Sequence, residues 1–330
     1  KAYTSNMQVV QIYEHGGLDV LKVEEVKIPE PAAGQVRVKI SAAGVNFIDT
    51  YQRTGLYPNP TGKFPWALGK EGGGTVDALG EGVNSPAVGT EVCFSGAQGS
   101  YAEYCCVAAA ACVTLPKGID SKIGAAVLLQ GLTAHYLVMD TQPIKKGDTV
   151  LIHAGAGGTG GLIIQMAKLL GATVITTVST QEKAVVAKEH GADHVIIYTE
   201  QDFHAEVLKI TNGKKVPVVY DGVGKATFDK SLACCAQRGH LVLFGNASGA
   251  VPPVDPLTLT KAGSISLTRP SLFHHVGDGM LEKRAADLFG WIAEGKIKVK
   301  IGKEYPLSDA RLAQEELSTR KTVGKLLLIP

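Results

Sequence analysis

A run of small residues at 153–161 is the part of this chain whose residue types and spacing most clearly suggest chemistry. It reads His153-Ala154-Gly155-Ala156-Gly157-Gly158-Thr159-Gly160-Gly161 and satisfies the pattern G-x-G-x-x-G. Such glycines allow a tight turn and let the backbone approach a pyrophosphate, which binds the N–H groups and positive dipole end of the helix that follows. The segment therefore predicts a dinucleotide site with contacts from Ala156, Gly157, Gly158, Thr159 and Gly160. The alternative is a glycine turn with only a structural role.

The residues after the second strand of the same region indicate which dinucleotide is bound. A carboxylate at that point binds the ribose 2′-hydroxyl of NADH and would repel the 2′-phosphate of NADPH. This chain has Ser179 and Thr180 there, with Lys183 one helical turn further. Hydroxyls and a cation suit a 2′-phosphate, so Ser179 and Lys183 predict NADPH. The other interpretation is that Ser179 only caps a helix and Lys183 is solvated.

The elements that position these residues follow from the pattern of apolar runs. Apolar strands are predicted at 149–153, 174–178, 195–198, 216–220 and 240–244, with helices at 160–170, 181–190, 203–210 and 228–235 between them. This alternation predicts a parallel sheet covered by helices on both faces. The first third of the chain instead shows short strands separated by glycine turns, which is typical of a barrel or sandwich. Beyond it, helices are predicted at 121–139, 281–294 and 308–318, and strands at 299–301 and 325–329.

Length and composition limit the class of protein. The 330 residues, 45% hydrophobic and 19% charged, indicate a globular chain of two domains. A net charge of +2 gives no reason to expect binding to nucleic acid or an anionic membrane. The six cysteines form no C-x-x-C pair, which indicates a reducing compartment. No apolar run is expected to reach the ~18 residues of a membrane span. With no apolar signal segment at the start, a cytoplasmic location is expected.

Four short segments carry a family resemblance that extends over nearly the whole chain. They are residues 43–49 (AGVNFID), 130–134 (QGLTA), 244–249 (FGNASG) and 267–273 (LTRPSLF). These segments resemble the zinc-independent NADPH:quinone oxidoreductases of the medium-chain dehydrogenase/reductase superfamily. The resemblance implies an α/β fold in two parts. A GroES-like β-rich catalytic domain would comprise 1–131 and 271–330, and a Rossmann doubly wound parallel sheet that binds NADPH would comprise 132–270.

The same resemblance separates the chain from the zinc alcohol dehydrogenases of that superfamily. Those enzymes carry a cysteine where this chain has Asn46, and Gly-His-Glu where it has Gly69-Lys70-Glu71. Catalytic zinc needs three N, O or S donors, so no zinc is expected. Lys70 also departs from the small hydroxyl residue usual in the zinc-free branch. It either pairs with a neighbour such as Glu71 or adds positive charge near the acceptor.

Four residues are expected, by resemblance, to act at the acceptor: Asn46, Asp49, Tyr51 and Tyr57. Asn46 would lie beside the nicotinamide, and the two tyrosines would line the acceptor pocket, where a phenol can donate a proton. Each has an alternative. Asn46 could satisfy a turn, Asp49 could orient neighbours or pair with Arg53, and the tyrosines could belong to the core with satisfied hydroxyls.

The remaining cofactor contacts are expected on several segments. By resemblance, Gln130 and Thr133 lie on the nicotinamide side, Tyr198 flanks the adenine, and Phe273 and Lys325 come from the returning tail. Lys325 has the alternative of a capping lysine. Phe244 and Asn246 lie at the carboxyl end of a predicted strand, where doubly wound sheets bind ligands.

These residues together predict an NADPH-dependent quinone reductase that works without zinc. A reduced nicotinamide supplies the hydride, and the protein positions it and excludes water. One alternative is an NADPH-dependent reductase of enones or alkenals. Another, from a different class, is an RNA-binding or crystallin-like structural protein, which the weak positive charge does not favour. The resemblance also implies a homodimer that pairs through the apolar strands at 242–244 and 264–267.

Overall fold

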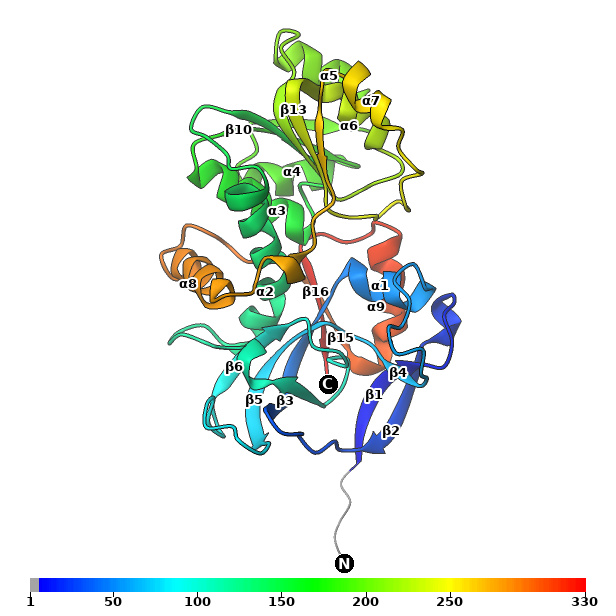
Figure 1. The fold of residues 1–330 in the computed structure, drawn as a ribbon, viewed down its shortest axis with the longest axis vertical. Helices are drawn as coiled ribbons and strands as arrows, with labels where there is room; N and C mark the ends of the chain where they lie inside the picture. The colour runs from blue at the N-terminus through cyan, green and yellow to red at the C-terminus, as the bar shows by residue number, and fades with distance from the viewer. Residues whose placement is uncertain (1–5) are drawn as a thin grey trace, which may run out of the picture. The chain divides into compact units, whose positions relative to one another are not determined.

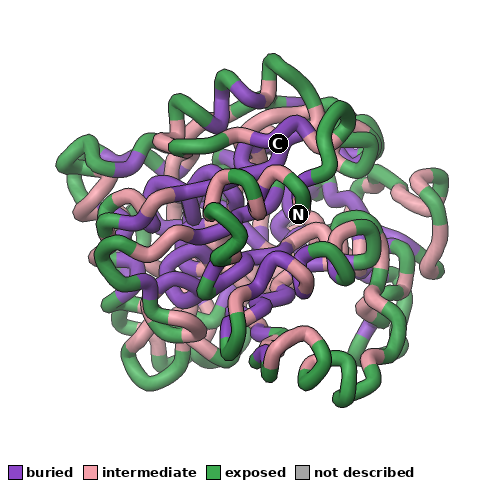
Figure 2. Tube along the Cα trace, turned by 90° about the horizontal axis from the view of Figure 1, so that it is seen from above, coloured by how far each residue is buried: buried purple, intermediate pink, exposed green. Residues whose placement is uncertain are grey.

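The structure is a computed structural model that describes residues 6–330, and the chain divides into two compact units. Unit 1 contains the residues up to Leu129 together with Val299–Pro330, and unit 2 contains Gln130–Lys298. Residues 271–298, which the sequence analysis assigned to the first domain, are grouped with unit 2. In Figure 2 the buried segments run through the interior of the fold, and exposed residues follow the outer turns and helix faces.

Unit 2 is built on a six-stranded sheet in the order β11-β10-β9-β12-β13-β14. Two of these strands, β10 and β13, are labelled in Figure 1. Every pair of neighbouring strands is parallel. Their bounds are β9 (Thr149–Ile152), β10 (Thr173–Val178), β11 (His194–Ile197), β12 (Val216–Asp221), β13 (Cys235–Leu243) and β14 (Ser266–Thr268). Continuous runs of buried apolar residues in these strands match a sheet that is covered on both faces.

Helices connect these strands in the way a doubly wound sheet requires. They are α3 (Gly158–Leu169), α4 (Gln181–Glu189), α5 (Phe203–Ile210) and α6 (Phe228–Cys234), followed by α7 (Pro256–Lys261), the 3-10 turn η4 (Leu272–His274) and α8 (Met280–Ala293). Helices α5 and α6 pack on the sheet residues Leu151, Ile175 and Val219. From β9 the chain builds outward through β10 to β11, and then returns to β12 on the other side of β9. Such a reversal of strand order marks the ligand-binding edge of this class of sheet.

Unit 1 contains two β-sheets. The first has the order β2-β1-β4, and the second has seven strands, in the order β15-β16-β3-β5-β6-β8 with β7 also paired to β3. The strands are β1 (Asn6–Ile12), β2 (Lys22–Lys27), β3 (Gln35–Val45), β4 (Trp66–Ala67), β5 (Glu71–Leu79), β6 (Glu91–Ser95), β7 (Tyr104–Ala108), β8 (Cys112–Thr114), β15 (Ile301–Pro306) and β16 (Lys325–Ile329). The helices are α1 (Phe47–Thr54) and α9 (Ala310–Ser318), with 3-10 turns η1 (Leu18–Val20), η2 (Ala109–Ala111) and η5 (Leu307–Asp309).

The predicted fold class, a β-rich unit and a doubly wound parallel sheet of the Rossmann kind, is confirmed. Several elements were not predicted, among them the strands β2, β4, β7 and β8 and the helices α1 and α7. Helix α1 has only eight residues, between Asn46 and Gly55, and Gly55 ends it in the left-handed conformation at φ 85°. Its sequence has a polar cap and a terminal glycine but too few apolar repeats to reveal a helix.

Helix α2 (Ser121–Tyr136) leads from unit 1 into unit 2 and continues as a π-helical turn, η3 (Leu137–Thr141). The expectation that no apolar segment is long enough to span a membrane was wrong in one respect. The combined helix Ser121–Thr141 has 21 residues, and an 18-residue stretch of it has a mean hydropathy of 1.2, which meets the criteria of length and composition. In the fold, 67% of that stretch is buried inside the protein, as in the core helix of a globular protein.

Candidate functional site

The glycine segment forms the turn between β9 and α3 in unit 2, at the carboxyl edge of the sheet. The turn begins at Ala154, which adopts the left-handed conformation at φ 56°. Its carbonyl oxygen accepts a hydrogen bond from the Gly157 N–H at 3.0 Å. A Cβ on Gly160 would lie 2.2 Å from that same oxygen, so only glycine lets α3 begin this close to the turn.

Gln130, which the sequence analysis predicted as a cofactor contact on the nicotinamide side, faces the start of α3. A Cβ on Gly158 would lie 2.0 Å from its side-chain oxygen. That Oε1 atom is buried and accepts no hydrogen bond within the described residues. The first N–H groups of α3 have no acceptor within the helix. A buried oxygen without a partner beside a glycine-lined helix start fits a dinucleotide, which brings both donors and phosphate acceptors.

The residues that predicted the kind of dinucleotide gather at the carboxyl ends of β10 and β11. Val178 of β10 pairs with Ile197 of β11, so the next residue on each strand, Ser179 and Tyr198, lies at the same end of the sheet. The Tyr198 N–H also donates to the Val178 carbonyl at 3.0 Å. Ser179, Lys183 and Tyr198 are all partly exposed, as residues that contact a ligand must be.

The residue that caps helix α4 tests the interpretation in which Ser179 only caps that helix. The helix is capped by Thr180, whose side chain accepts a hydrogen bond from the Lys183 N–H at 3.2 Å. The Ser179 carbonyl accepts a bond from the Thr199 hydroxyl at 2.8 Å. The alternative in which Ser179 serves as the helix cap was therefore wrong, because its neighbour has that role.

Phe244 and Asn246 follow β13 at the same edge of the sheet. The Phe244 ring covers Gly222, where a Cβ would lie 2.8 Å from the ring. With its side-chain amide turned to satisfy its neighbours, Asn246 donates to the Gly245 carbonyl at 3.2 Å and accepts from Arg269 at 3.1 Å. Thr133 lies on α2 and is half-buried, and Phe273 lies in η4 with 42% of its surface exposed. Unit 2 thus places its predicted contacts on six separate segments.

Two predicted residues of unit 1, Asn46 and Lys325, meet Glu71 because their strands are neighbours in register. Gly44 of β3 is paired with Glu71 of β5, and Val45 of β3 is paired with Leu326 of β16. Asn46 directly follows β3, and Lys325 begins β16. The ends of these strands therefore bring Asn46, Glu71 and Lys325 together.

The contacts among these three side chains are short and buried. The Lys325 ammonium donates to Asn46 Oδ1 at 2.8 Å and to Glu71 Oε2 at 2.6 Å. Asn46 Nδ2 donates to the same Glu71 oxygen at 2.8 Å, and the Leu129 N–H donates to Oε1 at 2.7 Å. Glu71 and Lys325 are 0% and 2% exposed, so each charge is compensated almost entirely by the other and by these donors. Lys325 neutralises a buried carboxylate, which the sequence analysis did not anticipate.

Asp49 lies one helical turn beyond Asn46, and no cation among residues 6–330 is hydrogen-bonded to it. Its Oδ2 accepts from the Asn46 N–H at 2.9 Å and from the Tyr101 hydroxyl at 2.7 Å, and Oδ1 is buried without a partner. Burial raises the pKa of Asp49 to about 6, although both hydrogen bonds and Lys325 act in the opposite direction. The alternative pairing with Arg53 was wrong, since Arg53 binds Gln314 and the Gly16 carbonyl.

Lys70, Tyr51 and Tyr57 are the other residues of unit 1 that the sequence analysis placed near the acceptor. The Lys70 ammonium donates to the Gly96 carbonyl at 3.2 Å, and burial lowers its pKa while Asp49 raises it. Glu71, the neighbour suggested as its partner, is bound to Lys325 instead. Tyr51 and Tyr57 contact each other edge to face, with ring centroids 5.2 Å apart, and both are partly exposed. They form an aromatic surface rather than part of the buried core.

These side chains do not fit a zinc ion. Asn46 Oδ1 and Glu71 Oε2 both bind the Lys325 ammonium, which has no lone pair to offer a metal. Over residues 6–330, no group of three or more His, Cys, Asp and Glu side chains is placed to hold a metal.

The sequence analysis missed several residues that organise these sites. Tyr101 gave no local signal, because only the fold brings it to Asp49. Asp221 could have been suspected, since it ends a buried strand at the carboxyl edge where ligands bind. His153, the first residue of the glycine segment, belongs to a buried network with Thr177, Ser231 and Asp221.

Known proteins resemble this chain over nearly its whole length. Residues 32–117 match the alcohol dehydrogenase GroES-like domain, and residues 158–285 match the zinc-binding dehydrogenase family. A quinone oxidoreductase of Pseudomonas aeruginosa is 44% identical over 97% of this chain and 99% of its own.

Two solved structures have the same fold. That of the Escherichia coli quinone oxidoreductase complexed with NADPH is 42% identical, with a TM-score of 0.95 over 98% of this chain and 100% of that one. A mycobacterial protein complexed with NADPH is 48% identical, with a TM-score of 0.94 over the same shares of the two chains.

Proposed function

We propose that this chain reduces a small quinone with NADPH. The premise is that the chain belongs to the zinc-independent quinone oxidoreductases of the medium-chain dehydrogenase/reductase superfamily. The observation that carries the proposal is the glycine turn at the start of α3, with the unpartnered Gln130 oxygen beside it. Two relatives of the same fold are described as complexed with NADPH.

The residues proposed to hold NADPH lie in unit 2. Ala156 through Gly160 would bind the pyrophosphate, Ser179 and Lys183 the 2′-phosphate, and Tyr198 the adenine face. Gln130, Thr133, Phe244, Asn246 and Phe273 would hold the remainder of the cofactor. When bound, NADPH supplies the hydride. The preference for NADPH rests on the hydroxyl and ammonium groups at positions where a carboxylate would repel the extra phosphate.

The residues proposed to act on the acceptor lie in unit 1. Two-electron reduction of a quinone to a hydroquinone consumes one hydride and one proton, so a proton must reach an acceptor oxygen. Tyr51 and Tyr57 present phenols on a partly exposed aromatic surface that suits stacking of a planar ring. Asn46 is fixed by Lys325 and Glu71, which leaves its amide orientation defined. Asp49, with its raised pKa, can hold a proton near neutral pH.

The test compares cofactors and acceptors in one assay. Oxidation of NADPH and of NADH is followed with an ortho-quinone, a para-quinone and an enone, with and without a chelator. Chelator-insensitive turnover of a quinone that is faster with NADPH supports the proposal. Turnover of the enone alone would replace it with a double-bond reductase, and binding of NADPH without turnover would favour a non-catalytic role.

The proposal includes a reducing, cytoplasmic compartment and a homodimer. All six cysteines are free thiols, which suits a reducing compartment. Of the two strands suggested for a dimer contact, β13 is internal, because it pairs with both β12 and β14. Only β14, at the edge of the sheet, remains available for pairing with a second copy. Light scattering of the purified protein tests this, and a monomeric mass would contradict it.

A further inference from the structure

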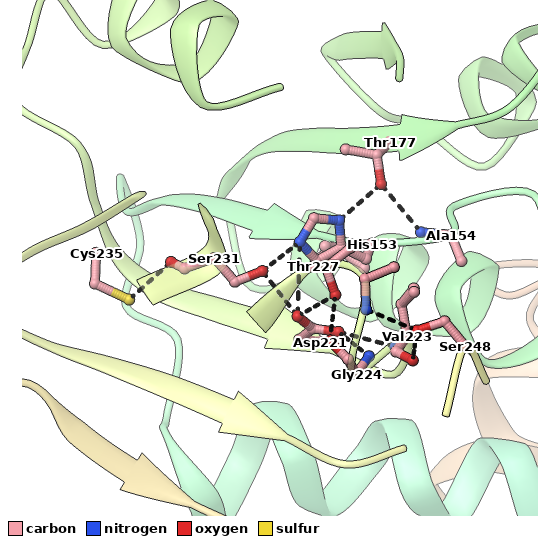
Figure 3. A network of polar contacts seen from close by, with 12 residues as sticks. His153, Ala154, Thr177, Asp221, Val223, Gly224, Thr227, Ser231, Cys235 and Ser248 are labelled. Carbon is pink, nitrogen blue, oxygen red and sulfur yellow. Dashed lines mark hydrogen bonds and ion pairs between the residues drawn. The ribbon is translucent and has the colours of Figure 1, made fainter. Parts of the chain in front are cut away.

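A buried polar network in unit 2 links four segments at the carboxyl edge of the sheet (Figure 3). Its centre is Asp221, the last residue of β12, which is 0% exposed. Asp221 Oδ1 accepts from the N–H groups of Val223 at 2.8 Å and Gly224 at 3.0 Å. Its Oδ2 accepts from the hydroxyls of Thr227 at 2.7 Å and Ser231 at 2.8 Å.

The network continues from Ser231 to the glycine turn through a single histidine. His153 Nε2 lies 2.8 Å from Ser231 Oγ, and Nδ1 lies 2.8 Å from Thr177 Oγ1. Thr177 Oγ1 in turn accepts a long hydrogen bond, at 3.4 Å, from the Ala154 N–H. His153 is 2% exposed, and Figure 3 shows its ring between the two hydroxyls.

The directions of these hydrogen bonds follow from Asp221, because a carboxylate only accepts. Ser231 gives its proton to Asp221, so it can only accept from His153, which must carry its proton on Nε2. The bare Nδ1 then accepts from the Thr177 hydroxyl, and the Thr177 oxygen remains free to accept from Ala154. Burial lowers the pKa of His153, which keeps the ring neutral and preserves this single arrangement.

The network ends where the turn is most constrained. Ala154 adopts φ 56°, a left-handed conformation that is unfavourable for a residue other than glycine. Its carbonyl sets the positions of Gly157 and Gly160 at the start of α3. A shift of His153 or Ala154 would therefore move the backbone donors that face the bound phosphates.

We propose that Asp221, acting through Ser231, His153 and Thr177, is a positioning residue that holds the glycine turn in the conformation that binds the pyrophosphate of NADPH. The proposal rests on the proposed function, because it assigns a second layer of residues to that same cofactor site. None of the four contacts the acceptor or the cofactor in this assignment; they act only through the backbone of the turn.

The variant Asp221→Asn reverses the directions of the hydrogen bonds in the network, while the side chain keeps nearly the same volume. An amide NH₂ in place of one oxygen must donate toward a hydroxyl. Ser231 would then donate to His153 Nε2, and the histidine proton would move to Nδ1. Nitrogen-15 NMR of the imidazole, assigned by loss of the signal in His153→Gln, reports which nitrogen carries the proton.

The expected result has a spectroscopic and a binding component. The unmodified protein should show a neutral His153 with the proton on Nε2, and Asp221→Asn should show it on Nδ1. The Kd for NADPH should rise about tenfold, with a parallel rise in KM and kcat within about twofold. The exposed carboxylate of Asp229, on α6, provides a matched control, and Asp229→Asn should leave the tautomer and the Kd unchanged.

A second variant keeps the proposal testable if Asp221→Asn does not fold. Thr177→Val removes the hydroxyl that joins His153 to Ala154, and it too should raise the Kd about tenfold, whereas Thr177→Ser should restore binding. Unchanged NADPH affinity in both folded variants, or a His153 proton on Nδ1 in the unmodified protein, would overturn the proposal. Failure of the unmodified protein to bind NADPH would instead overturn the proposed function.

Discussion

Two buried carboxylates, one in each unit, are stabilised in different ways. Glu71 in unit 1 is bound to the ammonium of Lys325, an amide and one backbone N–H. Asp221 in unit 2 is bound by two backbone N–H groups and two hydroxyls, and its nearest basic group, His153, is 4.0 Å away. Both side chains are 0% exposed.

Glu71 and Asp221 differ in how well the carboxylate remains compensated when one of its bonding partners is removed. Removing the cation from an ion pair leaves an uncompensated buried charge, which is far more costly than losing one neutral donor of several. The Glu71 cluster is therefore vulnerable at a single residue, and the Asp221 cluster shares its stabilisation over four. Asp49 is an intermediate case, with two donors and one oxygen without a partner.

The largest effect is expected for Lys325→Met, which removes the ammonium and keeps much of the volume. Glu71 would be left charged and buried, so the free energy of unfolding should fall by about 3–5 kcal/mol. Urea denaturation followed by circular dichroism measures this change. The double variant Glu71→Gln/Lys325→Met should recover most of the loss, because no buried charge remains. If the double variant were no more stable than the single one, the ion pair would not be the cause.

The next effect concerns the pH dependence of stability that arises from Asp49. Its pKa is about 6 in the fold and about 3.9 when unfolded. Between these pH values Asp49 is protonated more often in the folded chain than in the unfolded chain. It therefore makes the free energy of unfolding fall as pH rises from 4 to 7. Asp49→Asn should remove about 2–3 kcal/mol of that fall, measured by urea titrations at several pH values. Tyr101→Phe should instead steepen it, since one donor to the charged form is lost.

A smaller loss of stability is expected when one neutral hydrogen-bond donor to Asp221 is removed. Ser231→Ala leaves three donors on the carboxylate and deprives His153 Nε2 of its acceptor. The free energy of unfolding should fall by about 1–2 kcal/mol. A loss as large as that of Lys325→Met would contradict the idea that this cluster shares its stabilisation.

The smallest effect is expected at an ion pair on the surface. Lys122 and Glu304 lie 3.0 Å apart in unit 1 with about two fifths of each side chain exposed. Water and salt screen such pairs, so Lys122→Ala should change the free energy of unfolding by less than about 1 kcal/mol. A larger change would show that charge pairing as such, rather than burial, determines the losses predicted above.

The cofactor side of the fold was predictable because its signals are local. The turn at Gly155, Gly157 and Gly160 and the alternating strands and helices lie in one continuous stretch, so their pattern reveals both element type and order. The short helix α1 and the strand β2 were not predicted, since their apolar repeats are too brief to distinguish from turns.

The polar clusters could be predicted only in part, because their members come from distant parts of the sequence. Asn46 and Lys325 were identified separately by resemblance, yet their hydrogen bond depends on β16 pairing with β3. Tyr101 and Ser231 have no sequence pattern that distinguishes them from other buried polar residues. Only the register of the strands shows which of them meet.

The position of β16 has a consequence for the order in which the protein folds during synthesis. This strand lies between β15 and β3 inside the sheet of unit 1, but the ribosome makes it after all of unit 2. We expect unit 2 to close its sheet first, while unit 1 still has an open edge at β3 and a Glu71 without its ammonium. Nascent chains stalled before Lys325 should then give a protease-resistant fragment from unit 2 and none from unit 1.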